Sequence, residues 1–467
     1  MKNGRNSSRE INPAPARKGK TRAAIKASCA GAKAGRGSQL GASFFLENSL
    51  LYAYTLRYQS KWDSPIFPDQ THAATLTTAR LVAMLVVCCA GTFIVTTSGN
   101  SLAPFLQVIG NDVDRDLAAI AHLISFGALA WGVSSWIAGS LSDRVGRKSI
   151  LIGSMLALAL TRVGFSFAES YWAATLWHVV AGFAGGGFLG AVFACVSDHV
   201  PAKLRGRALG WVITGQSISM VLGVPILTYI GSFAGWRGAF RVHAALAVIS
   251  MLSLIWFIPP DLKRHMAAGR EHISFKSILR PELMVLLGAG AMERVCFAAI
   301  AIYLATFFQQ NYALSFSHLA WVLMLVAVGN LIGNLLGGQL ADRFPRRMLL
   351  FAASLGVTGI MVIPLLLWPV TLTFSIVLGF AYSFFNALGR PLYVATLSEV
   401  PNEVRGAVLG FNITLASIGW LLAASGGAQL LIKFGFTGLG VFSGLMAFIG
   451  VALSWVYLRM RKRSRLA

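Results

Sequence analysis

Residues 139–148 read GSLSDRVGRK and lie between two long apolar stretches. A second copy about 200 residues later, at residues 338–347, reads GQLADRFPRR. Both copies have the form G-x-L-x-D-R-x-x-R-[KR], in which a glycine ends one apolar stretch, an acid stands at its boundary, and cations open the next stretch. A motif that recurs once at this period indicates two homologous halves, not a solenoid of many short repeats.

A second repeat supports this division of the chain. Residues 200–206 read VPAKLRG and residues 400–406 read VPNEVRG, and each copy is followed four residues later by a glycine. The segment 259–282 begins with two prolines and carries mixed charge, so we expect it to be a cytoplasmic linker. It would join an N-terminal half at residues 79–258 to a C-terminal half at residues 283–458.

The residue types of the motif predict a conformational latch at the edge of the membrane. A glycine allows a second helix to approach closely at the end of a bulky span. The aspartate can accept charge-assisted hydrogen bonds from neighbouring arginines. The alternative, that the arginines only set topology, accounts for the cations but not for the repeated glycine and aspartate. The predicted latch residues are Gly139, Asp143, Arg144, Arg147, Gly338, Asp342, Arg343 and Arg346.

The composition predicts a membrane protein. The chain has 467 residues, of which 56% are hydrophobic and 12% charged, and its mean hydropathy is +0.66. Water-soluble domains carry about 25% charged residues, so a soluble enzyme is excluded. The net charge of +23 raises the possibility of a nucleic-acid partner. However, outside the N-terminal tail the cations fall mostly in short loops between apolar stretches, so we expect a lipid bilayer and no nucleic acid as partner.

Twelve apolar stretches have lengths near the roughly 20 residues that a bilayer requires. They predict an all-α membrane protein with twelve transmembrane helices in two pseudo-symmetric six-helix bundles. The predicted spans are 81–99, 117–138, 149–168, 171–195, 208–230, 240–258, 283–308, 317–340, 349–367, 372–397, 407–431 and 438–458.

The distribution of lysine and arginine predicts the topology. One set of loops, with the C-terminal tail, holds 20 of these residues, whereas the opposite loops hold only Arg115, Arg237, Arg241 and Lys433. Both termini are therefore expected on the cytoplasmic side. We also expect the membrane to be the inner membrane of a bacterial cell. Residues 459–467 form a basic cytoplasmic tail. Residues 1–78 are basic and poor in acids, which fits a disordered tail, an upstream extension or an organellar transit peptide.

The repeated motif resembles the signature loop of the major facilitator superfamily, found between its second and third helices and again between its eighth and ninth. The resemblance covers roughly residues 79–458 and implies a secondary transporter of a small-molecule substrate, not an enzyme. Residues 215–225, GQSISMVLGVP, and 235–240, GWRGAF, are similar to the fifth-helix region of twelve-helix drug and metabolite proton antiporters. Gly223 and Pro225 are the expected hinge of that helix, because proline frees a backbone carbonyl and glycine lowers stiffness.

Glu293 is the only acid placed well inside a predicted span, about 10 residues into the seventh. At about 1.5 Å per residue it lies near the middle of the bilayer, where an ionisable group is costly and usually functional. We expect it to carry a proton or to form a fixed ion pair. Arg390 is its expected partner, because the side chain of the adjacent Arg294 points about 100° away on a helix. These two arginines would bind an anionic substrate or balance the charge of Glu293.

The other candidate binding residues are polar side chains inside predicted spans. His178 stands where the superfamily motif R-x-x-x-G has its arginine, and it would either titrate near physiological pH or pack as a hydrogen-bonded histidine. Asn386 precedes Arg390 by one helical turn and should share its face. Asn330 would line a cavity or bridge two helices. Arg162 is expected to extend to the membrane surface.

No P-loop, metal-binding cluster or H-E-x-x-H motif occurs in the sequence, so we expect no cofactor and no metal. Its five cysteines show no C-x-x-C spacing. The sequence therefore predicts a monomeric secondary transporter of a small organic solute, coupled to protons, with export favoured. Two alternatives stay open: proton-coupled uptake of an organic anion, and a non-transporting membrane sensor on the same fold.

Overall fold

The computed structural model describes residues 78–201, 204–260, 280–400 and 402–464. The tail expected at residues 1–78 lies outside this part of the chain except for its last residue, and so do residues 261–279, which make up most of the expected linker. The last three residues of the expected C-terminal tail also lie outside it.

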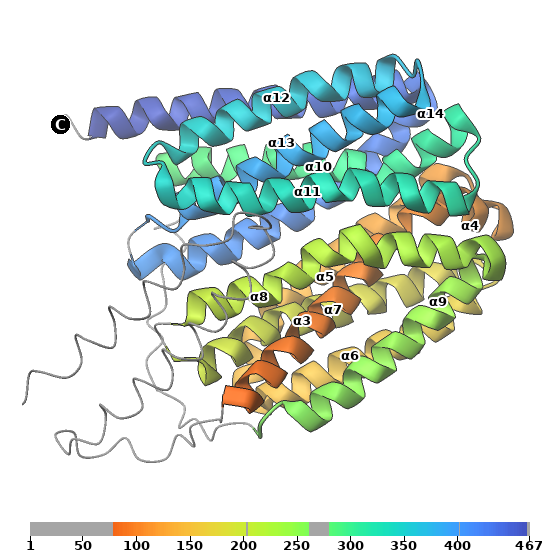
Figure 1. Cartoon of the computed structure of the whole chain (residues 1–467), viewed down its shortest axis with the longest axis horizontal. Helices are drawn as coiled ribbons and strands as arrows, with labels where there is room; N and C mark the ends of the chain where they lie inside the picture. Colours follow the sequence, from red (N-terminus) through yellow and green to blue (C-terminus); the bar gives the residue numbers. More distant parts are fainter. Residues whose placement is uncertain (1–77, 202–203, 261–279, 401, 465–467) are drawn as a thin grey trace, which may run out of the picture. The chain divides into compact units, whose positions relative to one another are not determined.

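The described residues are almost entirely helical, and they contain no strand (Figure 1). The helices are α3 (Thr78–Asn100), η1 (Ala103–Phe105), α4 (Leu106–Asp112), α5 (Leu117–Val145), α6 (Arg147–Ser166), α7 (Tyr171–His199), α8 (Arg205–Ile218), η2 (Ser219–Gly223), α9 (Val224–Phe257), α10 (Pro281–Tyr312), α11 (Phe316–Arg343), α12 (Arg347–Leu367), α13 (Leu372–Leu397) and α14 (Asn402–Ser464).

Ten helical segments of the described chain are long and apolar enough to cross a membrane. Two of them, Arg205–Phe257 and Phe411–Arg463, have 53 residues each, more than twice what a bilayer needs. Each is broken at one glycine in the positive-φ region, Gly235 at φ 65° and Gly435 at φ 61°. Glycine adopts this backbone conformation without steric cost. Each long segment therefore supplies two spans, and the twelve spans predicted from the sequence are confirmed.

The ends of the spans form two groups. We call the end that holds the connections α5–α6, α7–α8, α11–α12 and α13–α14 the charged end, which lies at the left in Figure 1, and the other the far end. Lys148, at the start of α6, shows that α9 returns to the charged end. Its Nζ donates to the carbonyl oxygens of Ile255 at 2.7 Å and Ile258 at 2.8 Å.

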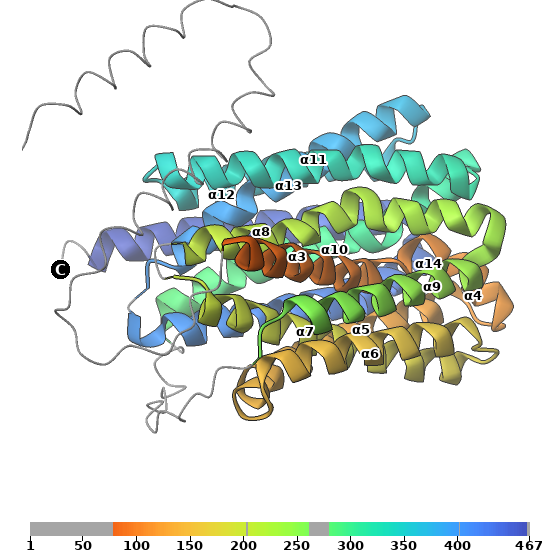
Figure 2. The same cartoon turned by 60° about the horizontal axis from the view of Figure 1, so that its bottom comes forward.

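The first half (α3–α9) and the second half (α10–α14) form two groups of helices that meet along two seams (Figures 1 and 2). On one seam α5 packs against α14, and on the other η2 and α9 pack against α11. Towards the far end, Ser125 and Ser425 are joined by a hydrogen bond of 2.6 Å between their hydroxyls. The ring of Phe105 lies 5.3 Å from that of Phe316. These contacts hold the two halves together near the far end.

The hydrophobic packing also joins the two halves near the far end. Phe105 and Leu227 of the first half belong to the same buried cluster as Leu304 of the second half. Residues of the first half nearer the charged end, such as Met84 and Leu151, belong to a separate cluster. The two halves thus share one core towards the far end and have no common core towards the charged end within the described residues.

The first copy of the motif forms an ion-pair network around one buried arginine. Gly146, at φ 104°, separates α5 from α6. Arg147 is 9% exposed and donates to Asp143 and Ser142 at the end of α5. Its Nε lies 3.2 Å from Oδ2 of Asp198 on α7. The network joins the ends of three helices, as expected for Asp143 and Arg147, whereas Arg144 is exposed.

The second copy uses different residues for the same purpose. Asp342, Arg343 and Arg346 are exposed. The next residue, Arg347, donates to the carbonyl oxygen of Ala341, and its Nη1 lies 2.9 Å from Oε1 of Glu399 at the end of α13. The ion pair of the second copy therefore runs from Arg347 to Glu399, and not through the predicted Arg346.

The expected close approach of a helix at Gly338 is wrong. A Cβ at Gly338 would meet no atom within 4 Å. The preceding Gly337 has this role, because a Cβ there would lie 2.3 Å from the carbonyl oxygen of Leu388 on α13. The surroundings of Gly139 lie outside the part of the chain whose side chains are described.

The predicted hinge coincides with a distortion of the helix. Ser219–Gly223 form one turn of π-helix, and Pro225 follows within the first turn of α9. Such a turn leaves the regular hydrogen-bond ladder locally disrupted and often marks a functional position. Gly223 also allows α3 to come close, because a Cβ there would lie 2.1 Å from Oγ1 of Thr97.

Candidate functional site

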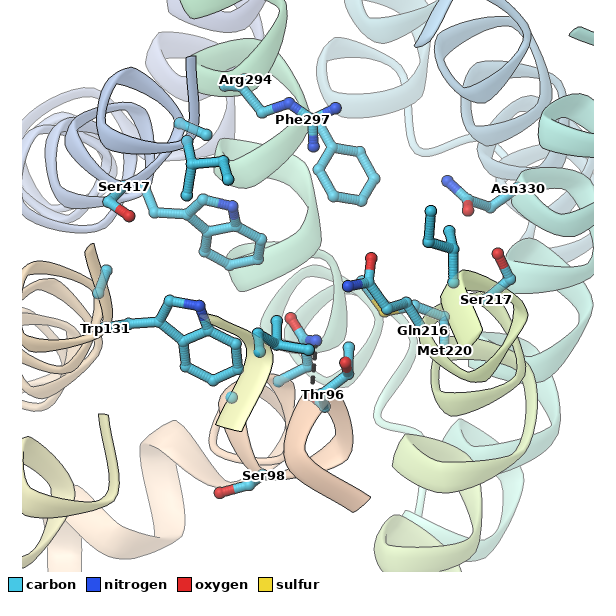
Figure 3. A pocket seen from close by; sticks show the side chains of 18 of the residues that line it. Thr96, Ser98, Trp131, Gln216, Ser217, Met220, Arg294, Phe297, Asn330 and Ser417 are labelled. Carbon is cyan, nitrogen blue, oxygen red and sulfur yellow. Dashed lines mark hydrogen bonds between the residues drawn. The ribbon is translucent and has the colours of Figure 1, made fainter. Parts of the chain in front are cut away.

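A cavity of about 500 Å³ lies between the two halves. Binding sites for small molecules have volumes of about 300–1,000 Å³. Its walls carry the aromatic residues Trp131, Phe297 and Trp420, and Figure 3 shows the first two facing the same space. The polar and charged lining residues include Asn100, Gln216, Asn330, Asn334, Arg162, Arg294 and Arg390, and no aspartate or glutamate is among the lining residues.

Glu293 lies behind the wall of this cavity on α10 and is 2% exposed. Its Oε1 is 3.3 Å from Nη2 of Arg390 on α13, so the predicted pair is confirmed. Its Oε2 is 3.0 Å from Nε of Arg294. The expectation that Arg294 does not reach Glu293 is therefore wrong, because a long arginine side chain can fold back across the angle between neighbouring positions. We call these three residues the charge cluster.

Two further residues hold Arg390 in place. Oδ1 of Asn386 accepts a hydrogen bond of 3.4 Å from Arg390, so the predicted shared face of α13 is confirmed. The guanidinium also lies 4.6 Å from the centre of the Phe297 ring, a distance typical of a cation–π contact. Arg390 is thus fixed by a carboxylate, an amide and an aromatic ring.

The charge cluster presents a positive face to the cavity. Arg294 and Arg390 line the cavity, whereas Glu293 does not. Two guanidinium groups share one carboxylate, so the cluster carries one unit of excess positive charge when all three residues are ionised. Such a surface favours an anionic group or a strong hydrogen-bond acceptor.

In the first half, His178 lines the cavity and is 4% exposed. Its ring lies 6.0 Å from that of Phe165 and packs against Gly127, where a Cβ would lie 2.7 Å from the imidazole Cδ2. The Nδ1 atom of His178 is buried and has no hydrogen-bond partner. The ring is therefore packed, but the hydrogen bond expected for a packing histidine is absent at Nδ1, and titration near physiological pH stays a prediction.

Arg162 is not at the membrane surface, and that expectation is wrong. Its side chain on α6 is 2% exposed and lines the cavity. Nη2 donates to the hydroxyl of Ser98 and, at 3.2 Å, to its carbonyl oxygen. The position near the end of a span suggested exposure, but α3 and α9 cover this part of α6. No signal in the sequence distinguishes the two cases.

Asn330 is on α11, on the wall of the cavity in the second half (Figure 3). Its Oδ1 and its carbonyl oxygen accept hydrogen bonds of 2.9 and 3.1 Å from Nδ2 of Asn334. The Nδ2 of Asn330 is buried without a partner. The cavity therefore brings together His178, Arg294, Asn330 and Arg390, while Glu293 and Asn386 support it from behind.

The sequence profile of the Major Facilitator Superfamily matches residues 88–310 and 286–467. The chain therefore belongs to the Major Facilitator Superfamily of membrane transporters. It is 29% identical over 382 residues to the inner membrane transport protein YdhP of Escherichia coli (strain K12), covering 80% of this chain and 95% of that protein.

Two other relatives have names that refer to drug resistance. The multidrug resistance protein MdtG of Proteus mirabilis (strain HI4320) is 25% identical over 393 residues, covering 80% of this chain and 95% of that protein. The chloramphenicol resistance protein of Streptomyces lividans is 27% identical over 306 residues, covering 65% of this chain and 78% of that protein.

The fold also matches a solved structure, the inward-facing and unoccupied form of a bacterial homolog to the human lysosomal transporter Spinster. The TM-score is 0.64 with 16% sequence identity, covering 82% of this chain and 96% of that one. This likeness confirms the predicted twelve-helix, two-bundle arrangement.

Proposed function

We propose that the chain is a secondary active transporter that exports a small organic solute across the bacterial inner membrane in exchange for protons. The observation that carries this proposal is the charge cluster on the wall of a cavity of about 500 Å³ between the two halves. Charged groups inside a membrane are costly and usually mark a substrate or proton pathway. The cavity is built within one chain, so we expect a monomer to be active.

The arrangement of the halves supports alternating access. The contacts Ser125–Ser425 and Phe105–Phe316 close the far end. The lining residues Gly210 and Thr214 lie one to three turns from the start of α8 at the charged end. We assign the charged end to the cytoplasm because it holds most of the lysine and arginine. Export would then require the far-end contacts to separate while the charged end closes.

The choice of export rests on the relatives and on the lining. Two relatives are named for resistance to several drugs and to chloramphenicol. The rings of Trp131, Phe297 and Trp420 provide a large apolar surface. Such a surface suits a solute with an aromatic or apolar body and a few polar groups.

Glu293 is the proposed proton carrier. When its carboxylate is ionised, it holds both guanidinium groups of the charge cluster. When it is protonated, the two ion pairs weaken and the surface that faces the cavity rearranges. In an exporter the solute binds the ionised cluster, so the solute and the proton exclude each other. Binding of solute to the fraction of molecules in which Glu293 is protonated then releases that proton.

Proton-coupled uptake of an organic anion is the second candidate, and one observation favours it. The lining contains three arginines and no acid. An anion that binds Arg294 and Arg390 takes the place of the Glu293 carboxylate. The displaced carboxylate is buried and must take up a proton or find another partner. In this case binding of solute consumes a proton, which is the opposite sign.

The sign of the proton change separates the two candidates. Solutes, beginning with chloramphenicol, are first screened for thermal stabilisation of the purified protein. A solute that binds is then added in weakly buffered solution with a pH indicator. Proton release supports the exporter, proton uptake supports the anion importer, and Glu293→Gln should remove either change. Binding without any proton change, or with a change that persists in Glu293→Gln, contradicts the assigned role of Glu293.

A further inference from the structure

Arg162 differs from the other two arginines of the cavity. The Arg294 and Arg390 guanidinium groups are joined to the Glu293 carboxylate at 3.0 and 3.3 Å. Arg162 is only 2% exposed, and no carboxylate of the described residues lies within ion-pair distance of it. A charge held away from water without a counterion is costly unless a ligand or a dipole compensates it.

The end of α3 compensates part of this charge. Ser98 lies in the last turn of α3, and its carbonyl oxygen accepts from Nη2 of Arg162. The last carbonyls of a helix carry a partial negative charge of about half a unit. The Phe240 ring, 5.4 Å from the guanidinium, adds a cation–π contact. These contacts explain the orientation of Arg162 but leave part of its charge unbalanced.

Two donors of Arg162 also lack acceptors. Its Nε and Nη1 atoms are buried and have no hydrogen-bond partner, and the same holds for Nδ1 of the neighbouring His178. Buried polar groups in proteins are nearly always hydrogen-bonded, so each exception requires an explanation. Because both residues line the cavity, an anion in the cavity would supply the missing acceptor and the missing charge.

We infer that Arg162, with the hydroxyl of Ser98, forms an anion subsite that binds the carboxylate of an aromatic or apolar monocarboxylate. This inference rests on the proposed transport function and specifies its substrate class. The planar guanidinium matches a carboxylate in charge and hydrogen-bond geometry. The apolar part of the solute can pack against Trp131, which lies close to Ser98. A Cβ placed at Gly99, the residue next to Ser98, would lie 3.4 Å from Cζ3 of Trp131.

The size of the cavity argues for a solute and not for a single inorganic ion. A volume of about 500 Å³ with two tryptophans and a phenylalanine on its walls is far larger than a halide requires. The charge cluster is the less favourable place for the carboxylate, because the Glu293 carboxylate already occupies both of its arginines. No acid of the described residues pairs with Arg162, so the part of its charge that α3 does not balance is available to the carboxylate of the solute.

The test compares two probes of equal shape, 2-naphthoate and the neutral 2-naphthamide, on the purified full-length protein. Quenching of tryptophan fluorescence reports binding, because Trp131 and Trp420 line the cavity. We expect naphthoate to bind about tenfold or more tightly than naphthamide, the factor that corresponds to one charge-assisted hydrogen bond. Arg162→Met should abolish this preference, Arg162→Lys should keep part of it, and Ser98→Ala should reduce it by a smaller factor.

Arg115→Met is the matched control, because it removes an exposed arginine outside the cavity and should leave both affinities unchanged. Should Arg162→Met not fold, the comparison of the two probes on the wild-type and Ser98→Ala proteins decides the question. Equal affinity of the wild-type protein for the two probes, or no binding of naphthoate, overturns the inference. So does a preference for naphthoate that survives in Arg162→Met but is lost in Arg294→Met.

Titration with sodium chloride distinguishes a site for small inorganic anions. If millimolar chloride displaces naphthoate and stabilises the protein by itself, Arg162 binds an inorganic ion and the assigned substrate class is wrong. The binding assay needs no membrane and no gradient. Charge-selective binding without gradient-driven transport would refute the proposed function alone, whereas transport of solutes without preference for carboxylates would refute this inference alone.

Discussion

The two halves repeat each other in sequence and in helix order, but they distribute their charges differently. In the first half Arg147, the first residue of α6, is buried, whereas the equivalent Arg346 of the second half is exposed. Inside the membrane the second half carries a carboxylate with two arginines, and the first half carries Arg162 with no acid partner among the described residues. The two halves therefore share one backbone framework but place their charges differently, so the framework does not determine the electrostatic role of each half.

The largest expected effect comes from removing the carboxylate that only the second half has. Glu293→Gln should abolish accumulation driven by a pH gradient in proteoliposomes, while solute exchange at equal pH continues, because exchange needs no net proton movement. His178→Gln in the first half is the matched comparison and should keep gradient-driven transport. Full gradient-driven transport by Glu293→Gln would exclude it as the obligatory proton carrier and make His178 the next candidate.

Breaking the ion pairs of the first motif copy should destabilise the protein more than breaking the ion pair of the second. Arg147→Met removes a buried cation from Asp143 and Asp198, whose side chains are 33% and 20% exposed, and should cost about 1.5–3 kcal/mol of unfolding free energy, as for hydrogen bonds to charged groups. Arg347→Met breaks a pair whose side chains are 28% and 34% exposed, and should cost about 0–1 kcal/mol. Thermal unfolding in detergent measures both. Equal losses would show that the two loops are equivalent in spite of their different burial.

Two neighbouring glycines of α11 test where close packing is required. A Cβ at Gly337 would lie 2.3 Å from the Leu388 carbonyl oxygen, whereas one at Gly338 would meet nothing within 4 Å. Gly337→Ala should therefore destabilise the protein by about 1–3 kcal/mol, as overpacking does. Gly338→Ala should be neutral or slightly stabilising, since alanine favours helix. A reversed order of melting temperatures would contradict the packing of α11 on α13.

The latch hypothesis predicts an effect on rate and a smaller effect on affinity. Asp143→Asn should slow transport by about tenfold, which corresponds to 1.4 kcal/mol of barrier, while solute affinity changes little. Asp342→Asn should be milder, because Asp342 is exposed and the ion pair of its loop runs from Arg347 to Glu399. Transport rates and binding constants of both variants decide the matter. Similar losses of affinity in both, without a change in rate, would refute the latch.

Much of the fold could be predicted because hydropathy and length leave few alternatives for a membrane helix. The predicted spans ended at residues 230 and 431 and began again at 240 and 438, so Gly235 and Gly435 fell in the gaps where the chain reverses. The sequence did not reveal that single residues make these turns. Positive φ values follow from the backbone path, which hydropathy does not report.

The site was predicted only in part, for a physical reason. Glu293 and Arg390 could be paired because few charges lie deep in the membrane and such charges seek partners. Arg294 was misplaced because an arginine side chain is long enough to reach back to its neighbour in the chain, and Arg162 was misplaced because hydropathy does not show that α3 and α9 cover this part of α6. In the second motif copy the ion pair is formed by Arg347 and not by Arg346, and this depends on the position of Glu399, just after the end of α13, which only the folded structure shows.

The single-residue turn at Gly235 has a mechanical consequence. It leaves no slack between the helix that contains η2 and the helix that follows it, and this second helix packs along α6. If the fifth span bends at η2, the sixth span should therefore move together with it, because only Gly235 separates the two. Gly435, at φ 61°, joins the eleventh and twelfth spans by the same kind of single-residue turn, so these two spans should also move together.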